Sequence, residues 1–88
     1  MNPQNGYDIE DIATGMSAEI AKTITDADIV LFASVSMDSN AVHMDEEFGR
    51  TTMFGGRIAH GMLTASLLSS VLGNRLPGPG AIYLSQSL

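Results

Sequence analysis

The sequence predicts an α+β fold in which a sheet wraps around one buried helix. Residues Gly61 to Leu72 carry no charge, and apolar side chains cover most of the circumference of the helix they would form. Ala81 to Leu88 alternates partly between apolar and polar residues, as in a strand that enters a sheet. One or two strands cannot enclose such a helix, because an isolated hairpin is marginal in water. We therefore expect further strands, supplied by a C-terminal continuation or by partner chains.

The elements before this helix are expected in the following order. Residues 7–15 are predicted to be irregular, and Ala18 to Thr23 is predicted to form a strand. Thr25 should open a helix, because Asp28 stands in a capping-box relation to it. The apolar residues of this first helix end near Ser36.

Two loops and a helical turn are expected next. Residues 37–44 are predicted to be a loop, because turn-forming residues follow its first position. Asp45 to Phe48 predicts a helical turn with acids at its start, where the helix dipole favours them, and Gly49 would end it. Residues 50–57 are expected to form a second loop with Gly55-Gly56 as its flexible point.

The apolar helix should end in a rigid turn. Gly73 is a good residue to end the helix, and Leu76 to Gly80 alternates proline with glycine. The longest apolar stretch, Ile58 to Gly73, is interrupted by His60, threonine and serine. It is therefore too short and too polar to span a membrane.

Composition limits the class of protein. The chain has 88 residues, 44% of them hydrophobic, which suits one small domain. It has no cysteine, which excludes a disulfide framework, a thiolate zinc site and a cysteine nucleophile. Residues 1–6 lack a positive charge followed by an apolar run, so we expect no signal or transit peptide. These features predict a cytoplasmic protein.

Charge argues against nucleic acid as a partner. The net charge is −6, and only four basic residues are available for phosphate contacts. All ten acidic residues lie between Asp8 and Glu47, whereas three arginines and no acid follow Phe48. This asymmetry fits either chance in a short chain or a C-terminal half that accepts an anionic ligand.

Asp38 and His43 are the first candidates for chemistry. Fully extended, the chain between them would span roughly 17 Å at about 3.3 Å per residue. They could act on one water only if Ser39 and Asn40 turned the chain back. A carboxylate and an imidazole held together can remove and supply a proton near neutral pH. The other interpretation is a solvated aspartate beside an incidental histidine.

His60-Gly61 is the second candidate, at the start of the apolar helix. The first backbone N–H groups of a helix have no internal partner, and a glycine lets a ligand oxygen approach them closely. A thioester carbonyl bound there would be polarised as in an oxyanion hole. Alternatively, Gly61 serves only tight packing or an unusual φ.

Other interpretations were compared with these two. His43, Asp45 and His60 could bind a metal, but they lack a recognised helical spacing for ligands. Ser69 and Ser70 could be nucleophiles, but no strand–serine–helix elbow precedes them. We therefore expect neither a metal site nor a serine nucleophile. The methionines fit gap-filling roles.

Taken together, the chain resembles the MaoC-like dehydratases, and within them the (R)-specific enoyl-CoA hydratases. The resemblance covers about residues 7–88. It rests on four stretches in the same order: Phe32 to Asp45, Arg57 to Leu63, Ala65 to Leu67, and Leu76 to Leu84.

The resemblance implies a hot-dog fold, a long antiparallel sheet around a central helix, of which residues 1–88 would form the N-terminal part, truncated after the first strands. It implies a homodimer that shares its active sites, a coenzyme A thioester as substrate and no cofactor. The implied reaction is reversible syn hydration of trans-2-enoyl-CoA to (R)-3-hydroxyacyl-CoA in fatty-acid or polyhydroxyalkanoate metabolism. A non-catalytic acyl-CoA-binding module, an inactive fragment, or another hot-dog thioester enzyme is the alternative.

The resemblance also assigns roles to residues. Asp38 and His43 would activate water and pass a proton to the α-carbon, and the Gly61 N–H would hold the thioester carbonyl. Ser69 and Asn40 would support the pair. Two positions depart from the family pattern: Met37 replaces a frequent glycine, which costs roughly 1 kcal/mol if φ is positive there, and Ala41 replaces a frequent proline.

Overall fold

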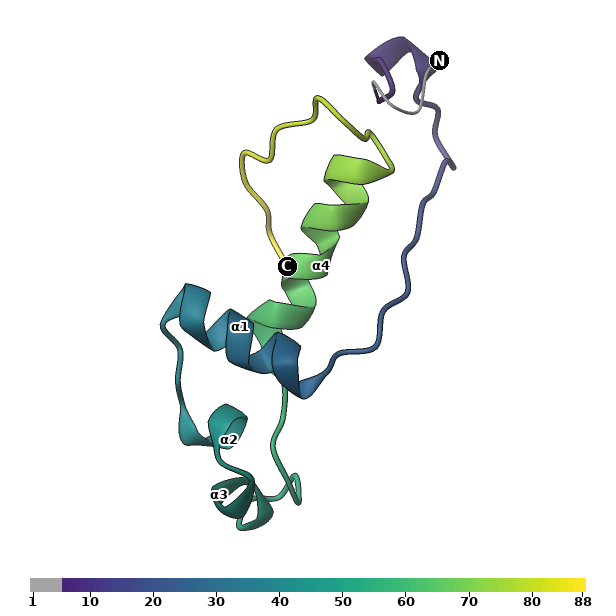
Figure 1. The fold of residues 1–88 in the computed structure, drawn as a ribbon. Coiled ribbons are helices and arrows are strands. Elements are labelled where there is room, and N and C mark those ends of the chain that lie inside the picture. The colour runs from purple at the N-terminus through teal and green to yellow at the C-terminus, as the bar shows by residue number, and fades with distance from the viewer. Residues whose placement is uncertain (1–5) are drawn as a thin grey trace. The chain divides into compact units, whose positions relative to one another are not determined.

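The computed structural model describes residues 6–88, which form helices joined by irregular segments (Figure 1). The elements are η1 (Ile9–Asp11), α1 (Asp26–Ser36), α2 (Ala41–Met44), α3 (Glu46–Arg50) and α4 (Gly61–Asn74). We expected no signal or transit peptide at residues 1–6, and almost all of these residues lie outside the described part. The chain divides into a central unit, Lys22–Ala65, and a terminal unit, Ser66–Leu88 with the described part of Met1–Ala21.

The two strands expected from the sequence are not formed within residues 6–88. Ala18 to Thr23 and Ala81 to Leu88 both lack regular secondary structure. A strand needs a neighbour to pair its backbone N–H and C=O groups, and neither segment has one here. The predicted helices are therefore present, whereas the predicted sheet is absent from these residues.

Helix α1 begins where the capping residues predicted it. The Thr25 hydroxyl accepts a hydrogen bond from the backbone N–H of Asp28 at 3.2 Å, and the Asp28 carboxylate accepts one from the N–H of Thr25 at 2.9 Å. The helix ends at Met37, whose φ of 65° and ψ of 14° are left-handed. The chain then turns away toward α2.

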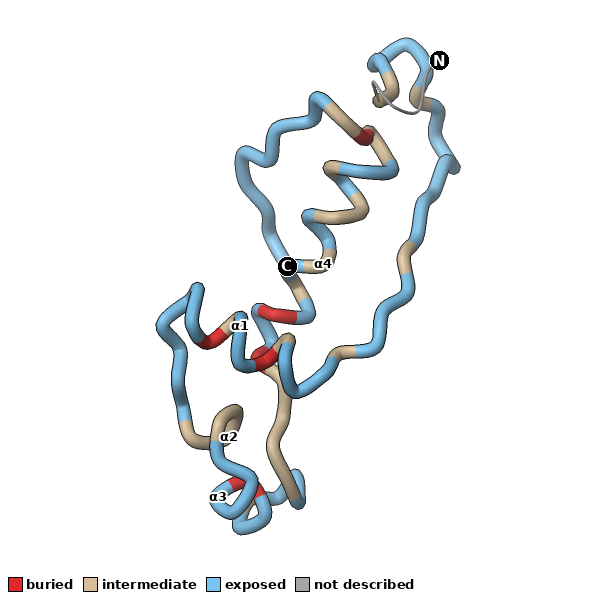
Figure 2. Tube along the Cα trace, in the orientation of Figure 1, coloured by how far each residue is buried: buried red, intermediate tan, exposed pale blue. Residues whose placement is uncertain are grey.

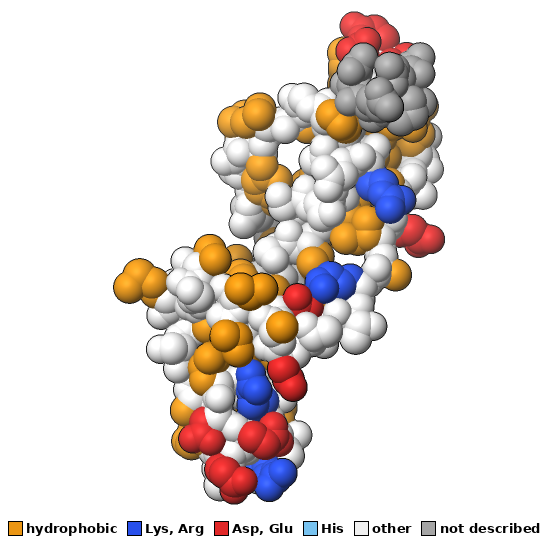
Figure 3. Space-filling model, viewed as in Figure 1, with side chains coloured by type: hydrophobic (Ala, Val, Ile, Leu, Met, Phe, Trp, Pro, Cys, Tyr) orange, Lys and Arg blue, Asp and Glu red, His pale blue; other side chains and the backbone are white. Residues whose placement is uncertain are grey.

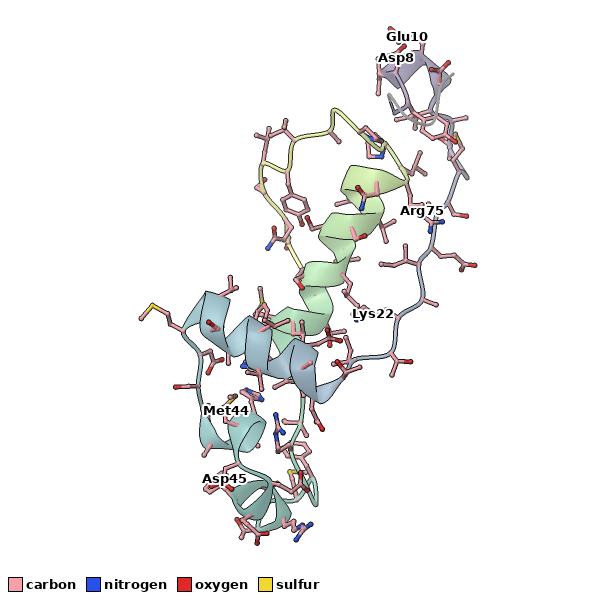
Figure 4. The ribbon with its side chains drawn as sticks, in the orientation of Figure 1. Asp8, Glu10, Lys22, Met44, Asp45 and Arg75 are labelled. Atoms are coloured by element: carbon pink, nitrogen blue, oxygen red, sulfur yellow. The ribbon has the colours of Figure 1, made fainter. Side chains whose placement is uncertain are left out.

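The predicted loop over residues 37–44 was wrong in its second half, which forms α2. The Asn40 side chain accepts a hydrogen bond from the N–H of Val42 at 3.2 Å and so caps this short helix. Asp45 ends α2 and caps α3 by accepting from the N–H of Phe48 at 3.2 Å. Figure 4 shows Met44 and Asp45 where one helix passes into the other.

Helix α3 confirms the predicted acidic helical turn but does not stop at Gly49. It continues to Arg50, because Gly49 keeps helical hydrogen bonding while its α-carbon lies against the loop that follows. A Cβ on Gly49 would lie 2.4 Å from the carbonyl carbon of Gly56. Gly49 is therefore required by close packing rather than as a helix end.

The central unit has a small core. Ile29, Ala33 and Leu63 are its buried apolar side chains, and His60 is its fully buried polar one. Helix α1 packs against α2, and α2 against α3. Buried positions in Figure 2 are correspondingly few. Hydrophobic side chains are visible over α1 in Figure 3, and charged ones gather over the part that holds α3.

Helix α4 confirms the predicted apolar helix and extends it by two residues, from Leu72 to Asn74. Leu63 is its one buried residue, and Met62 is 60% exposed. The prediction that this helix is buried on nearly every side is wrong for residues 6–88, since the sheet expected around it is absent from them. Among the described residues, none of the helices has the length and apolar character needed to cross a membrane.

The terminal unit holds the second half of α4 and the predicted turn. The N–H of Gly78 donates to the carbonyl of Leu72 at 2.9 Å, and the N–H of Tyr7 donates to the carbonyl of Pro77 at 2.7 Å. Gly78 has a φ of 88°, which is why glycine is needed in this turn. An open cavity of about 420 Å³ adjoins the turn. Its lining is formed by Ser69, Leu72, Gly73, Pro77 and residues 81–85.

Candidate active site

His43 is held in one tautomer by the segment that precedes α4. Its Nδ1 lies 2.9 Å from the backbone carbonyl oxygen of Ile58. A carbonyl can only accept, so Nδ1 carries the proton and donates, and in the neutral ring the lone pair is on Nε2. The N–H of Ile58 also donates to the carbonyl of Val42 at 3.1 Å. Two hydrogen bonds therefore fix the ring and the backbone of α2 to the same residue.

Arg57 anchors α2 from the same side. Its Nε donates to the backbone carbonyl of His43 at 2.6 Å, and its Nη1 lies 3.7 Å from a carboxylate oxygen of Asp26. The Arg57 side chain is largely buried, and its Nη2 is buried without a partner among the described residues. Arg57 thus connects α2 to the first turn of α1. Sequence reasoning considered Arg57 only as a positive charge and missed this role.

Asp38 follows the left-handed residue Met37 and is exposed. Its Oδ1 accepts a hydrogen bond from the N–H of Asn40 at 3.3 Å, and its own N–H donates to the hydroxyl of Ser36 at 3.2 Å. Asn40 therefore contacts Asp38 through its backbone and caps α2 through its side chain. The expected reversal of the chain between Asp38 and His43 is present, and the cap at Asn40 produces it.

His60 contacts both candidates and is 2% exposed. Its Nε2 donates to the backbone carbonyl of Asp38 at 2.8 Å. Its ring stacks on that of His43, with centroids 3.9 Å apart and planes inclined by 27°. The Phe32 ring lies 4.9 Å away on a tilted plane. Sequence reasoning noticed His60 only as a helix start or a metal ligand, and missed these contacts.

Asp38, His43 and His60 form one cluster. Each offers a carboxylate oxygen or ring nitrogen, and these atoms all lie within 4.8 Å of one another. One water with two hydrogen bonds of about 2.8 Å can bridge such a distance. The metal hypothesis paired the histidines with Asp45, but Asp45 caps α3 and Asp38 occupies the third position.

The stacking of the two rings opposes a metal ion in this cluster. A histidine nitrogen binds an ion at about 2.0–2.1 Å, with the ion near the plane of the ring. Because the His43 and His60 rings lie face to face, their lone pairs point along nearly parallel planes. An ion close to the plane of one ring would lie away from the plane of the other in this arrangement. The arrangement suits proton transfer better than metal binding.

Gly61 begins α4 directly after the cluster. The carbonyl of His60 accepts from the N–H groups of Leu63 and Thr64, so the N–H groups of Gly61 and Met62 precede the first helical hydrogen bond. A Cβ on Gly61 would meet no atom within 4 Å, and Gly61 is not among the glycines with positive φ. Neither tight packing in the described residues nor an unusual φ accounts for this glycine.

Ser69 lies in the terminal unit and is exposed on α4. It lines the cavity of that unit and belongs to a different unit from Asp38 and His43. Its predicted support of the pair therefore stays a prediction. Asn40 is the predicted supporting residue that the structure brings to Asp38.

A family model described as "MaoC like domain" matches residues 9–86, which include Asp38, His43 and Gly61. The chain belongs to the MaoC-like domain family. An (R)-specific enoyl-CoA hydratase of Rhodospirillum rubrum is 61% identical over 79 residues, which are 90% of this chain and 55% of that protein. A 3-hydroxybutyryl-CoA dehydratase of Methylorubrum extorquens is 51% identical over 90% of this chain and 50% of its own length.

A solved structure has a similar fold. The unliganded R-hydratase PhaJ1 of Pseudomonas aeruginosa superposes with a TM-score of 0.89 at 44% identity, over 93% of this chain and 53% of that one. The MaoC-like chain thus spans about half the length of the curated relatives it matches.

Proposed function

We propose that this chain is the N-terminal part of an (R)-specific enoyl-CoA hydratase that adds water reversibly to trans-2-enoyl-CoA. The observation that carries the proposal is the pairing of Asp38 with His43. The His43 ring is tied through Nδ1 to Ile58, and the cluster that includes the Asp38 carboxylate spans less than 4.8 Å. The family and the names of the similar proteins support the same reaction.

The pair supplies a base and an acid to one water. As the water oxygen bonds to the β-carbon, one of its protons passes to the pair, and the α-carbon takes up a proton on the same face. The net change is one H and one OH added across the double bond. His43 Nε2 holds a lone pair because Nδ1 donates to Ile58, so this nitrogen can accept or return the proton.

The start of α4 supplies the second part of the site. Electron density moves to the thioester oxygen as water adds, and backbone N–H groups at a helix start stabilise such a charge. A Cβ on Gly61 would meet no atom within 4 Å, and the Gly61 N–H precedes the first helical hydrogen bond, which supports this N–H as the donor to the carbonyl oxygen. Asn40 supports Asp38, and Ser69 is proposed as a further support.

The remaining parts of the proposal concern the whole protein. Residues 1–88 would belong to one hot-dog domain whose sheet, completed beyond this segment, covers the apolar faces of α4. The protein would act as a cytoplasmic homodimer on coenzyme A thioesters of fatty-acid or polyhydroxyalkanoate metabolism, without metal or cofactor. The exposure of Met62 and other apolar side chains on α4 supports a covering sheet.

The test is hydration of crotonyl-CoA by the full-length protein that carries this segment. Asp38→Asn should abolish loss of the enoyl absorbance while the protein stays folded. Glu47→Gln is the matched control, since it removes an acid whose side chain is 84% exposed and lies outside the cluster. Its turnover should equal that of the wild type.

Three results would contradict the proposal. Turnover retained in Asp38→Asn would remove the pair from the mechanism. Binding of crotonyl-CoA by the wild type without absorbance loss would favour the non-catalytic binding module, and release of free thiol would identify a thioesterase.

A further inference from the structure

We propose that His60 is a positioning residue that sets the geometry of Asp38, His43 and the start of α4 together. The proposal rests on the hydratase function above. It adds a residue that touches neither water nor thioester but contacts each part of the site. His60 is the fully buried side chain of the described residues.

The first contact fixes the backbone of Asp38. His60 Nε2 donates to the Asp38 carbonyl at 2.8 Å across 22 positions of sequence. This bond holds the residue that follows the left-handed turn at Met37. Asp38 is exposed and its carboxylate accepts from the neighbouring residue Asn40, so the bond to His60 links Asp38 to the buried part of the unit.

The second contact supports the ring of His43. The two rings stack with centroids 3.9 Å apart, and the Phe32 ring lies 4.9 Å from that of His60. The hydrogen bond to Ile58 restrains one edge of the His43 ring, and the stack restrains its face. Together they leave the ring little freedom to swing away from Asp38.

The third link is covalent. His60 precedes Gly61, and its carbonyl accepts the first hydrogen bonds of α4 at 3.0 and 3.3 Å. Displacement of His60 would therefore move the proposed carbonyl site as well as the pair. One side chain thus relates the base to the site that holds the thioester.

The unpartnered nitrogen of His60 supports a role for the imidazole itself. Its Nδ1 is buried with no hydrogen-bond partner among the described residues. A phenylalanine could stack in the same place without burying an unsatisfied nitrogen, which costs free energy. The imidazole is accounted for by the Nε2–H that reaches Asp38.

Three variants of the full-length protein separate the hydrogen bond to Asp38 from the stacking on His43. His60→Phe keeps a ring but loses the donor. His60→Gln keeps an amide donor near the position of Nε2 but loses the ring, and His60→Asn is its matched control with a shorter reach. We expect kcat for crotonyl-CoA to fall roughly 10- to 100-fold in His60→Phe and His60→Asn, as for a misplaced catalytic group. KM should stay within about threefold, and Gln should recover part of the loss, since the donor is restored.

The outcomes distinguish this inference from the function on which it rests. A wild type without hydratase activity would contradict the proposed function. If the wild type is active and Asp38→Asn is not, a kcat within about twofold of wild type in His60→Phe and His60→Asn would overturn the role of His60 alone. Rates are referred to the folded fraction.

If these variants fail to fold, a measurement on the wild-type protein still tests the role of His60. Long-range ¹⁵N–¹H correlation spectra report which ring nitrogen of each histidine is protonated. Protonation of His60 at Nε2 supports the bond to Asp38. Protonation at Nδ1 alone would overturn the proposal, because Nε2 could not then donate to a carbonyl.

Discussion

The guanidinium of Arg57 donates from Nε to the backbone carbonyl of His43 at 2.6 Å. Ile58, the next residue, accepts from the His43 ring and donates to the carbonyl of Val42. The segment before α4 thus holds the residue that carries the proposed proton transfer by its ring and by its backbone.

Met37→Gly should raise the free energy of unfolding by about 1 kcal/mol. Met37 has a φ of 65°, which a side chain disfavours and glycine tolerates. Its side chain is 87% exposed, so little packing is lost. Urea unfolding measures the gain, and Met37→Ala, which keeps a Cβ, should not show it. Equal stability of the Gly and Ala variants would contradict strain at this position.

Ala41→Pro should stabilise the protein by about 0.4–1 kcal/mol. Ala41 is the first residue of α2, where proline fits because its N–H has no intrahelical partner. Thermal unfolding measures the effect. Val42→Pro is the control and should destabilise, since the N–H of Val42 donates to the Asn40 side chain. A loss of stability in Ala41→Pro would contradict the assigned start of α2.

The salt bridge between Lys22 and Asp28 should make the stability of the protein fall at acidic pH. A hydrogen bond from Lys22, at 2.8 Å, and then one from the backbone of Thr25 lower the pKa of Asp28 below its ordinary value of 3.8. A lowered pKa adds stability that is present above 3.8 and is lost as pH falls through the lower, folded value.

The measurement for Asp28 is the melting temperature of the wild type and of Asp28→Asn from about pH 6 down to about pH 2. The difference between them should be constant above about pH 5 and should shrink as pH falls below 3.8. Lys22→Met should reduce that difference. A difference independent of pH would contradict the ion pair.

Gly61→Ala should separate activity from stability. The open space around Gly61 accommodates a methyl group, and alanine favours helix, so the variant should be as stable as the wild type or more so. Hydration of crotonyl-CoA should fall roughly 100-fold if the methyl group displaces the thioester oxygen from the N–H groups.

Gly49→Ala is the matched control for Gly61→Ala. Its Cβ would lie 2.4 Å from the carbonyl carbon of Gly56, so this variant should lose stability, as measured by its melting temperature. Undiminished turnover in Gly61→Ala would exclude the helix start from the reaction.

The sequence predicted those parts of the fold that local residues determine. Thr25 and Asp28 predicted the start of α1, and the uncharged run from Gly61 predicted α4. Helix α2, which begins at Ala41, was missed because its four residues are too few to show helical periodicity. The helix depends instead on the cap at Asn40. The prediction of two strands was wrong for residues 6–88, because a strand needs neighbouring strands that these residues do not supply.

The sequence indicated candidate chemical groups for the site, but not the residues that hold these groups in position. Asp38, His43 and Gly61 were proposed from residue type, order and resemblance, and their catalytic roles stay predictions. The supporting contacts of Arg57 and His60 were missed because they reach His43 and Asp38 across 14 and 22 positions of sequence. No local pattern records such contacts. An arginine and a histidine shortly before the helix start are the signal that could have indicated them.

Helix α2 has four residues, far fewer than an isolated helix needs to persist in water. It exists because residues 57, 58 and 60 hold it from outside. His43 and this segment therefore form and open together as one cooperative unit. A weakened contact there lowers the fraction of molecules that have a site at all, rather than loosening the site equally in every molecule.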